Sequence, residues 1–140
     1  MTLRTRHPRS ALAFDWGLAH IGVAVGQTAT RTATPLTHLG AREGKPDWDL
    51  IGNLIEEWKP DVVVVGLPLN LDGNEGELAP RARKFGRRLA GRFGCTVEFQ
   101  DERLSSREAY TRTKAGDNPE DLHAVAAQVI LEDWLREQTP

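Results

Sequence analysis

Apolar residues occur in short blocks along the first third of the chain, and each block has the length of a β-strand. Two such blocks, 11–14 and 21–25, are separated only by the segment DWGLAH. Strand-length apolar runs joined by so short a connection predict a β-hairpin. A weaker third block covers 33–39. Pro35 within it favours a strand at the edge of the sheet, because proline cannot donate to a central hydrogen-bond ladder.

The middle of the chain alternates between helical and strand patterns. Four apolar residues recur at helical spacing between Pro46 and Pro60, namely Ile51, Leu54, Ile55 and Trp58. Four consecutive valines follow at 62–65. An apolar run without alternation indicates a strand buried on both faces, as in a parallel sheet. After a loop rich in glycine and asparagine, a second helix is predicted at about 78–93, with apolar positions on one side.

The last third of the chain adds one strand and further helices. The segment CTVEFQ at 95–100 reads as a strand. Ser105 with Glu108 fits a capping box that opens a short helix. Asn118 and Pro119 fit the cap and first turn of a last helix that runs to about 137. Hairpins come first and helical connections later, which predicts an α/β fold with a mixed five-stranded sheet flanked by helices.

Composition narrows the possible functions without selecting one. With 140 residues, 27% of them charged and 39% hydrophobic, the chain fits one globular domain at 11–137 behind a flexible basic tail at 1–10. The single cysteine, Cys95, excludes an intrachain disulfide and a CxxC zinc site, and we expect it to be buried as a small apolar residue. The first apolar run is too short for a signal peptide, and no run reaches the ~18 residues of a membrane span. We therefore expect a cytoplasmic protein that makes no membrane contact.

Acidic residues stand at the ends of two predicted strands. Asp15 ends the first strand, and Asp101 and Glu102 end the strand that begins near 95. If these strands run parallel to the valine strand, their carboxyl ends lie at one edge of the sheet, where open α/β sheets place their sites. Carboxylates that converge there favour a hard divalent cation, and two such ions could act on a phosphodiester. The alternative is that Asp15 merely caps a turn.

The same residues carry a family resemblance. The segments FDWGLAHIGVAVG, VVVGLPLNLDGNEG, ARKFGRRL, DERLSS and ILEDWL resemble the successive motifs of the YqgF/RuvX family, in the family's order and over 11 to about 136. The resemblance implies a ribonuclease H-like fold, shared with Holliday junction resolvases of the RuvC type. It also implies hydrolysis of phosphodiester bonds with Mg²⁺ or Mn²⁺, in 5′-end maturation of pre-16S rRNA or on branched DNA.

The resemblance also suggests site residues. Asp15 matches the first catalytic acid, and Glu102 matches the second, with Asp101 as the fallback. An ungapped count places His123 where the family's third acid is expected, so this chain departs from the pattern there. Neutral imidazole can still ligate a metal or move a proton, which keeps His123 as a candidate ligand. Asp121, two residues away, is the alternative after a local shift.

Basic residues provide a candidate surface for nucleic acid. They cluster on the second predicted helix, mostly away from its apolar side, with Arg81, Lys84, Arg87 and Arg88 as the main candidates. Arg103, beside the acidic pair, and Asn70, in the glycine-containing loop after the valine strand, are further candidates. The ordinary interpretation of such a charge run is a solvated helix face. Since the formal net charge is -2, nucleic-acid binding must depend on a local patch.

Three other functions remain open at this point. One is resolution of Holliday junctions in branched DNA. Another is a noncatalytic role as a nucleic-acid-binding ribosome assembly factor, in which His123 marks a lost site. The third is nucleotide hydrolysis of the actin-like type, which the chain is too short to support with two lobes. The expected partner is structured RNA or branched DNA, bound by a monomer or a homodimer.

Overall fold

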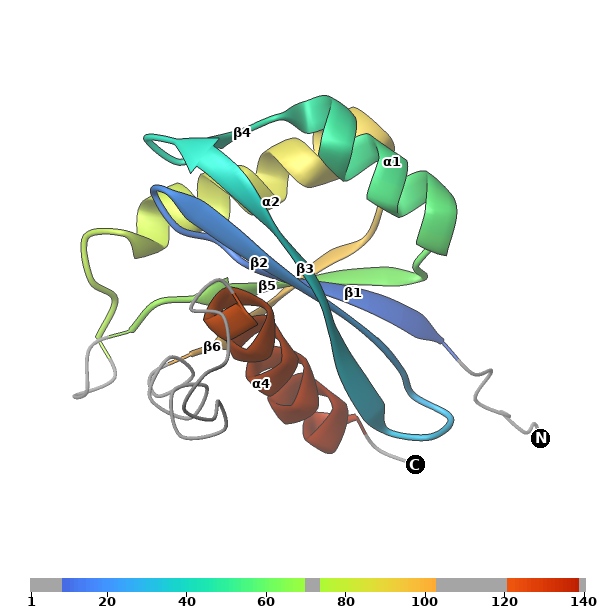
Figure 1. Cartoon of the computed structure of the whole chain (residues 1–140). Helices are drawn as coiled ribbons and strands as arrows, with labels where there is room; N and C mark the ends of the chain where they lie inside the picture. Colours follow the sequence, from blue (N-terminus) through green and yellow to red (C-terminus); the bar gives the residue numbers. More distant parts are fainter. Residues whose placement is uncertain (1–8, 70–73, 103–120, 139–140) are drawn as a thin grey trace.

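The computed structural model describes residues 9–69, 74–102 and 121–138. Six strands in these residues form one mixed sheet in the order β4-β3-β2-β1-β5-β6 (Figure 1). The strands are β1 (Ser10–Asp15), β2 (His20–Gln27), β3 (Thr32–Arg42), β4 (Lys45–Pro46), β5 (Val62–Leu67) and β6 (Val97–Asp101). The predicted mixed sheet is confirmed, but five strands was one too few. The missed strand, β4, has only two residues and so leaves no periodic signal.

Strand direction sets the position of the carboxyl ends. The hairpin partners β1, β2 and β3 are antiparallel, whereas β1, β5 and β6 run parallel to one another. The ends of β1, β5 and β6 therefore lie at the same edge of the sheet, as the sequence predicted.

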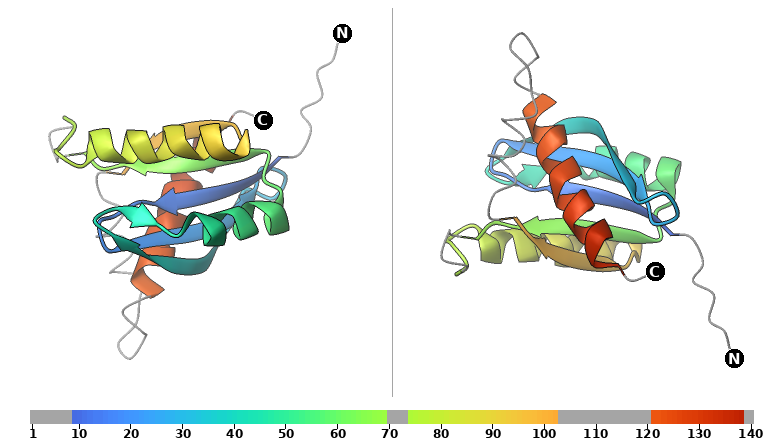
Figure 2. Two further views of the ribbon diagram at one scale, coloured as in Figure 1. Left: turned by 90° about the horizontal axis from the view of Figure 1, so that it is seen from above. Right: turned by 90° about the horizontal axis from the view of Figure 1, so that it is seen from below.

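Helices cover both faces of the sheet. Helices α1 (Trp48–Trp58) and α2 (Ala79–Phe93) lie on one face, and α4 (Asp121–Glu137) crosses the other (Figure 2). Along β5, Val63 and Val65 join the core beneath α1 and α2, while Val62 and Val64 join the core beneath α4. The run of valines is thus explained by burial on both faces.

The third strand is longer than the sequence suggested. It runs over 11 residues, and Pro35 pairs with Ala24 beside a break in register between Val23 and Ala24. A β-bulge of this kind accommodates a proline, because the ladder is already interrupted there.

Several expectations concern residues outside the described ranges: the short helix opened by Ser105, the Asn118-Pro119 helix start and most of the N-terminal tail. Cys95 is half-buried and packs against the core under α1 and α2. Burial raises the pKa of its thiol. Within the described residues, no helix is long and apolar enough to span a membrane.

Candidate active site

Two carboxyl groups from distant parts of the chain meet at the carboxyl edge of the sheet. Asp15 is the last residue of β1, and Glu102 directly follows β6, where its backbone N–H donates to the Leu67 carbonyl oxygen over 3.0 Å. The Asp15 carboxyl group hydrogen-bonds with that of Glu102. Burial raises the pKa of Asp15 from 3.8 to about 6, although the hydrogen bond to Glu102 opposes this rise.

The contact between these groups depends on a glycine. The strand between them in the sheet is β5, and Gly66 in β5 pairs with Gln100 of β6. A Cβ atom at Gly66 would lie 2.6 Å from the Glu102 Oε2 atom. The glycine that ends the valine run therefore leaves the space through which Glu102 reaches Asp15 across a whole strand.

Asp101, the fallback for Glu102, lies elsewhere. Its negative charge acts on the Arg83 guanidinium of α2 and contributes to raising the pKa of that group, after the larger effect of a hydrogen bond to Glu75. Arg83 also forms a salt bridge with Glu75. Because neighbouring residues of a strand face opposite sides, Asp101 faces α2 while Glu102 faces α4 and Asp15. Asp101 and Glu102, although adjacent in the sequence, therefore face opposite sides of the sheet.

His123 lies in the first turn of α4, next to the strand that pairs with Asp15. A Cβ atom at Gly22, the β-ladder partner of Asp15, would lie 1.8 Å from the His123 carbonyl oxygen. This approach is possible only because Gly22 has no side chain. The start of α4 therefore lies beside the strand position that pairs with Asp15. The side chain of Asp121 is outside the described part of the structure.

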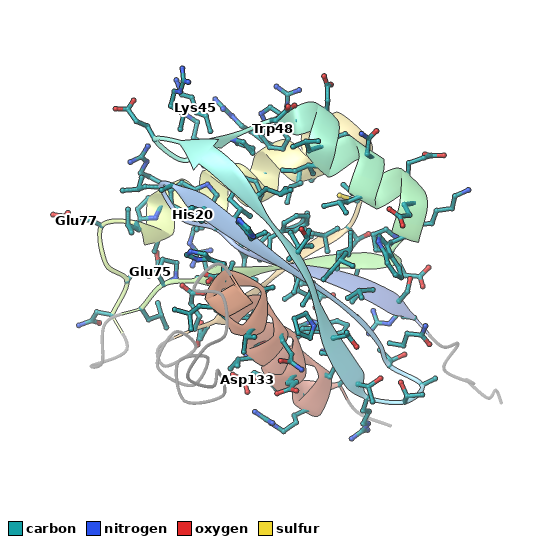
Figure 3. All side chains as sticks on the ribbon, in the orientation of Figure 1. His20, Lys45, Trp48, Glu75, Glu77 and Asp133 are labelled. Atoms are coloured by element: carbon teal, nitrogen blue, oxygen red, sulfur yellow. The ribbon has the colours of Figure 1, made fainter. Side chains whose placement is uncertain are left out.

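Three histidines cluster at the start of α4. The His123 ring stacks on His20, with ring centroids 4.5 Å apart and planes inclined by 22°. His38 lies 5.8 Å from His20 and 6.2 Å from His123 between ring centroids. The Nδ1 atom of His20 is buried and has no hydrogen-bond partner among the described residues. Figure 3 labels His20 on β2, close to the start of α4.

Sequence reasoning missed His20 and His38. The sequence held one indication of His20. It is two residues from Gly22 in the same strand, so the two residues lie on one face of the sheet. The described residues contain no group of three histidine, cysteine or acidic side chains arranged to hold a metal ion. Two carboxyl groups in contact nevertheless suit a hard divalent cation, since oxygen is its preferred ligand and its charge would replace the proton between them.

The basic candidates fall into separate groups. Arg81, Lys84 and Arg88 line one pocket beside α2, whereas Arg87 is exposed and does not line it. Asn70 and Arg103 lie outside the described residues. Trp16 is only 6% exposed, so it is a core residue and not a platform on which a base could stack.

Comparison with known proteins identifies the family. A family model described as "RuvX: Holliday junction resolvase" matches residues 9–137. The chain belongs to the RuvX family. Its match covers β1 through α4 and so includes both carboxyl groups and His123.

Curated RuvX relatives are close in sequence. The "Putative pre-16S rRNA nuclease" of Nitrosococcus oceani is 52% identical over 135 residues, covering 94% of this chain and 89% of that protein. The protein of the same name from Aeromonas salmonicida is 52% identical over 136 residues, covering 93% and 96%.

Solved structures share the RuvX fold at low identity. Thermus thermophilus RuvC in complex with a Holliday junction substrate has a TM-score of 0.51 at 15% identity, over 91% of this chain and 93% of that one. The Fowlpox virus resolvase, also solved with Holliday junction DNA, has a TM-score of 0.55 at 10% identity, over 91% and 97%. These similarities confirm the expected RuvC-like, ribonuclease H-like fold.

Proposed function

We propose that this protein is a divalent-metal-dependent nuclease that hydrolyses phosphodiester bonds in 5′-end maturation of pre-16S rRNA. The observation that carries the proposal is the contact between Asp15 and Glu102 at the carboxyl edge of the sheet. The names of the close RuvX relatives support RNA as the substrate.

Asp15 and Glu102 are the residues that would hold Mg²⁺ or Mn²⁺, with His123 as the proposed third ligand. A bound cation would supply positive charge that activates water and stabilises the phosphodiester oxygens in the transition state. The partly desolvated carboxyl pair would fix the position of that charge relative to the sheet edge. Gly66 and Gly22 would maintain this geometry, because side chains at either position would displace Glu102 or α4.

The test is cleavage of an end-labelled RNA that spans the mature 5′ end of 16S rRNA, with Mg²⁺ or Mn²⁺ present. Glu102→Gln should lower the cleavage rate by at least about 100-fold, since it replaces a ligand oxygen at constant volume. Asp101→Asn is the matched control, because it makes the equivalent change one residue away on the opposite face. Equal rates for wild type and Glu102→Gln would contradict the proposed metal site.

Resolution of Holliday junctions is a second candidate, favoured by the description of the RuvX family model. A labelled four-way DNA junction in the same assay separates the two substrates. Binding of either nucleic acid without cleavage of either, under both metals, would instead support the noncatalytic assembly factor.

A further inference from the structure

A pocket of about 190 Å³ opens on the face of the sheet opposite α4. It lies between the turn from β3 through β4 into α1 and the first half of α2. Four cationic side chains line it: Lys45, Arg81, Lys84 and Arg88. Lys45 and Trp48 are labelled in Figure 3, at β4 and at the start of α1.

Charge in the pocket is unbalanced. Glu43 is the one acidic residue among those that line it. All four cations are exposed, and none has a carboxylate partner within the described residues. Four cations gathered with one acidic residue leave an excess of positive charge, so the pocket favours an anionic ligand.

One of these cations is already held in place. The Arg81 Nη2 atom donates to the Glu43 carbonyl oxygen over 2.8 Å, and the guanidinium lies 5.6 Å from the Trp16 ring centroid. The Trp16 indole N–H donates to the Gly44 carbonyl oxygen over 2.9 Å. Gly44 has a φ of +80°, and a Cβ atom there would lie 2.3 Å from the Trp16 ring. The turn and Arg81 are therefore fixed on Trp16, which reduces the entropy lost when Arg81 binds a ligand.

The aromatic residues do not make this a site for a base. Trp16 is 6% exposed, and the Arg92 guanidinium lies 4.5 Å from the Trp48 ring centroid. Trp48 also stacks with Phe85, with ring centroids 5.7 Å apart. The volume is also below the ~300–1,000 Å³ of pockets that enclose a drug-sized ligand. Size, charge and covered rings together favour a phosphate group over a whole nucleotide.

The pocket lies directly behind the carboxyl pair. Side chains along β1 alternate, so that Ala13 contributes to the core under α4 and Phe14 to the core under α1 and α2. Asp15 continues the first series and Trp16 the second. Asp15 thus places its carboxyl group on the α4 face of the sheet, and the next residue, Trp16, forms the base of the pocket on the opposite face.

We propose that this pocket binds a phosphate group of the nucleic-acid strand that flanks the scissile bond. The identity of the ligand as nucleic acid rests on the proposed function, whereas the anion site rests on the pocket itself. The bound phosphate is either an internal phosphodiester or a terminal monoester, and both offer the same oxygens to Lys84 and Arg88.

The test measures binding of 3′-fluorescein-labelled single-stranded RNA in EDTA, which prevents metal-dependent cleavage. Lys84→Glu should weaken binding at least about tenfold, the loss expected for one charge-assisted contact. It should also lower the slope of log K against log salt by ~0.7. Lys59→Glu is the matched control, since Lys59 is an exposed lysine at the end of α1, outside the pocket. Equal effects of the two substitutions would overturn the proposal.

Two further arms complete the experiment. The first arm compares a 5′-phosphate probe with its 5′-hydroxyl form. If wild type binds the 5′-phosphate form more tightly and Lys84→Glu binds both forms equally, the pocket binds a terminal phosphate. If Lys84→Glu weakens binding of both probes equally, the pocket binds an internal phosphodiester. If Lys84→Glu lowers the unfolding temperature, Lys84→Gln replaces it, and normal binding by that variant overturns the proposal. Because binding is measured without metal, failure here is distinguishable from failure of Glu102→Gln to abolish cleavage.

Discussion

Replacement of Asp15 by asparagine should stabilise the metal-free protein at neutral pH. Burial raises the pKa of Asp15 from 3.8 to about 6, so ionising this group is unfavourable in the folded state. Each pKa unit corresponds to about 1.4 kcal/mol, which sets an upper limit of about 3 kcal/mol on the cost. Asp15 is only half-buried, and we expect solvent to reduce this cost to about 1–2 kcal/mol. The asparagine amide removes the charge and can donate to Glu102.

The sign of the pH dependence follows from proton binding. Between pH 3.8 and about 6, the folded state binds the Asp15 proton and the unfolded state has released it. The free energy of unfolding of wild type therefore falls through this range, and the loss is complete above it. Asp15→Asn lacks this loss. The difference in stability between variant and wild type should be near zero at about pH 4 and reach its maximum above about pH 7.

Urea unfolding at pH 4 and pH 7.5 in EDTA measures this difference directly. Addition of Mg²⁺ at pH 7.5 should then stabilise wild type and leave Asp15→Asn unchanged, because a ligand that binds only the folded state raises its stability. A variant less stable than wild type at pH 7.5, or a difference that does not vary with pH, would refute the desolvated carboxyl pair. If Asp15→Asn loses cleavage without gaining stability, Asp15 acts in catalysis but its charge does not destabilise the folded state.

The remaining predictions concern the same edge of the sheet. Gly66→Ala should cost about 1–3 kcal/mol and most of the cleavage activity, because its Cβ would lie 2.5 Å from Ile130 Cδ1 and 2.6 Å from Glu102 Oε2. Gly40→Ala is the control, since nothing lies within 4 Å of its added Cβ. His123→Ala should lose most activity in a Mg²⁺ and Mn²⁺ titration, whereas His123→Asp should keep it and Asp121→Asn should matter less. An inactive Asp121→Asn beside an active His123→Ala would make Asp121 the third ligand.

Convergence of Asp15 and Glu102 could be predicted because it depends only on strand direction. Parallel strands end at one edge, and both residues stand at strand ends. The choice between Asp101 and Glu102 was harder, since it requires knowing which face of β6 is covered by α4. The valines of β5 could not indicate this, because both of their faces are buried.

The histidine cluster illustrates a different limit. Ala24 pairs with Pro35, and an uninterrupted ladder would then pair Gly22 with Thr37. The bulge shifts the register by one, so that Gly22 pairs with His38 instead. A shift of one residue moves every following side chain to the other face of the sheet. His38 therefore reaches His20 and His123 only because of an irregularity that no periodic pattern reveals.

The net charge of -2 says little about how this protein binds a polyanion such as a nucleic-acid strand. At the end of β1, carboxyl groups lie on the α4 face, and cations without carboxylate partners among the described residues lie on the other. A phosphodiester strand would be repelled by Asp15 and Glu102 alone. Cations behind the same edge, together with a metal bound between the acids, would reverse that local field. The field at this edge, more than the net charge, should therefore decide binding, and salt should weaken it even though the protein as a whole is acidic.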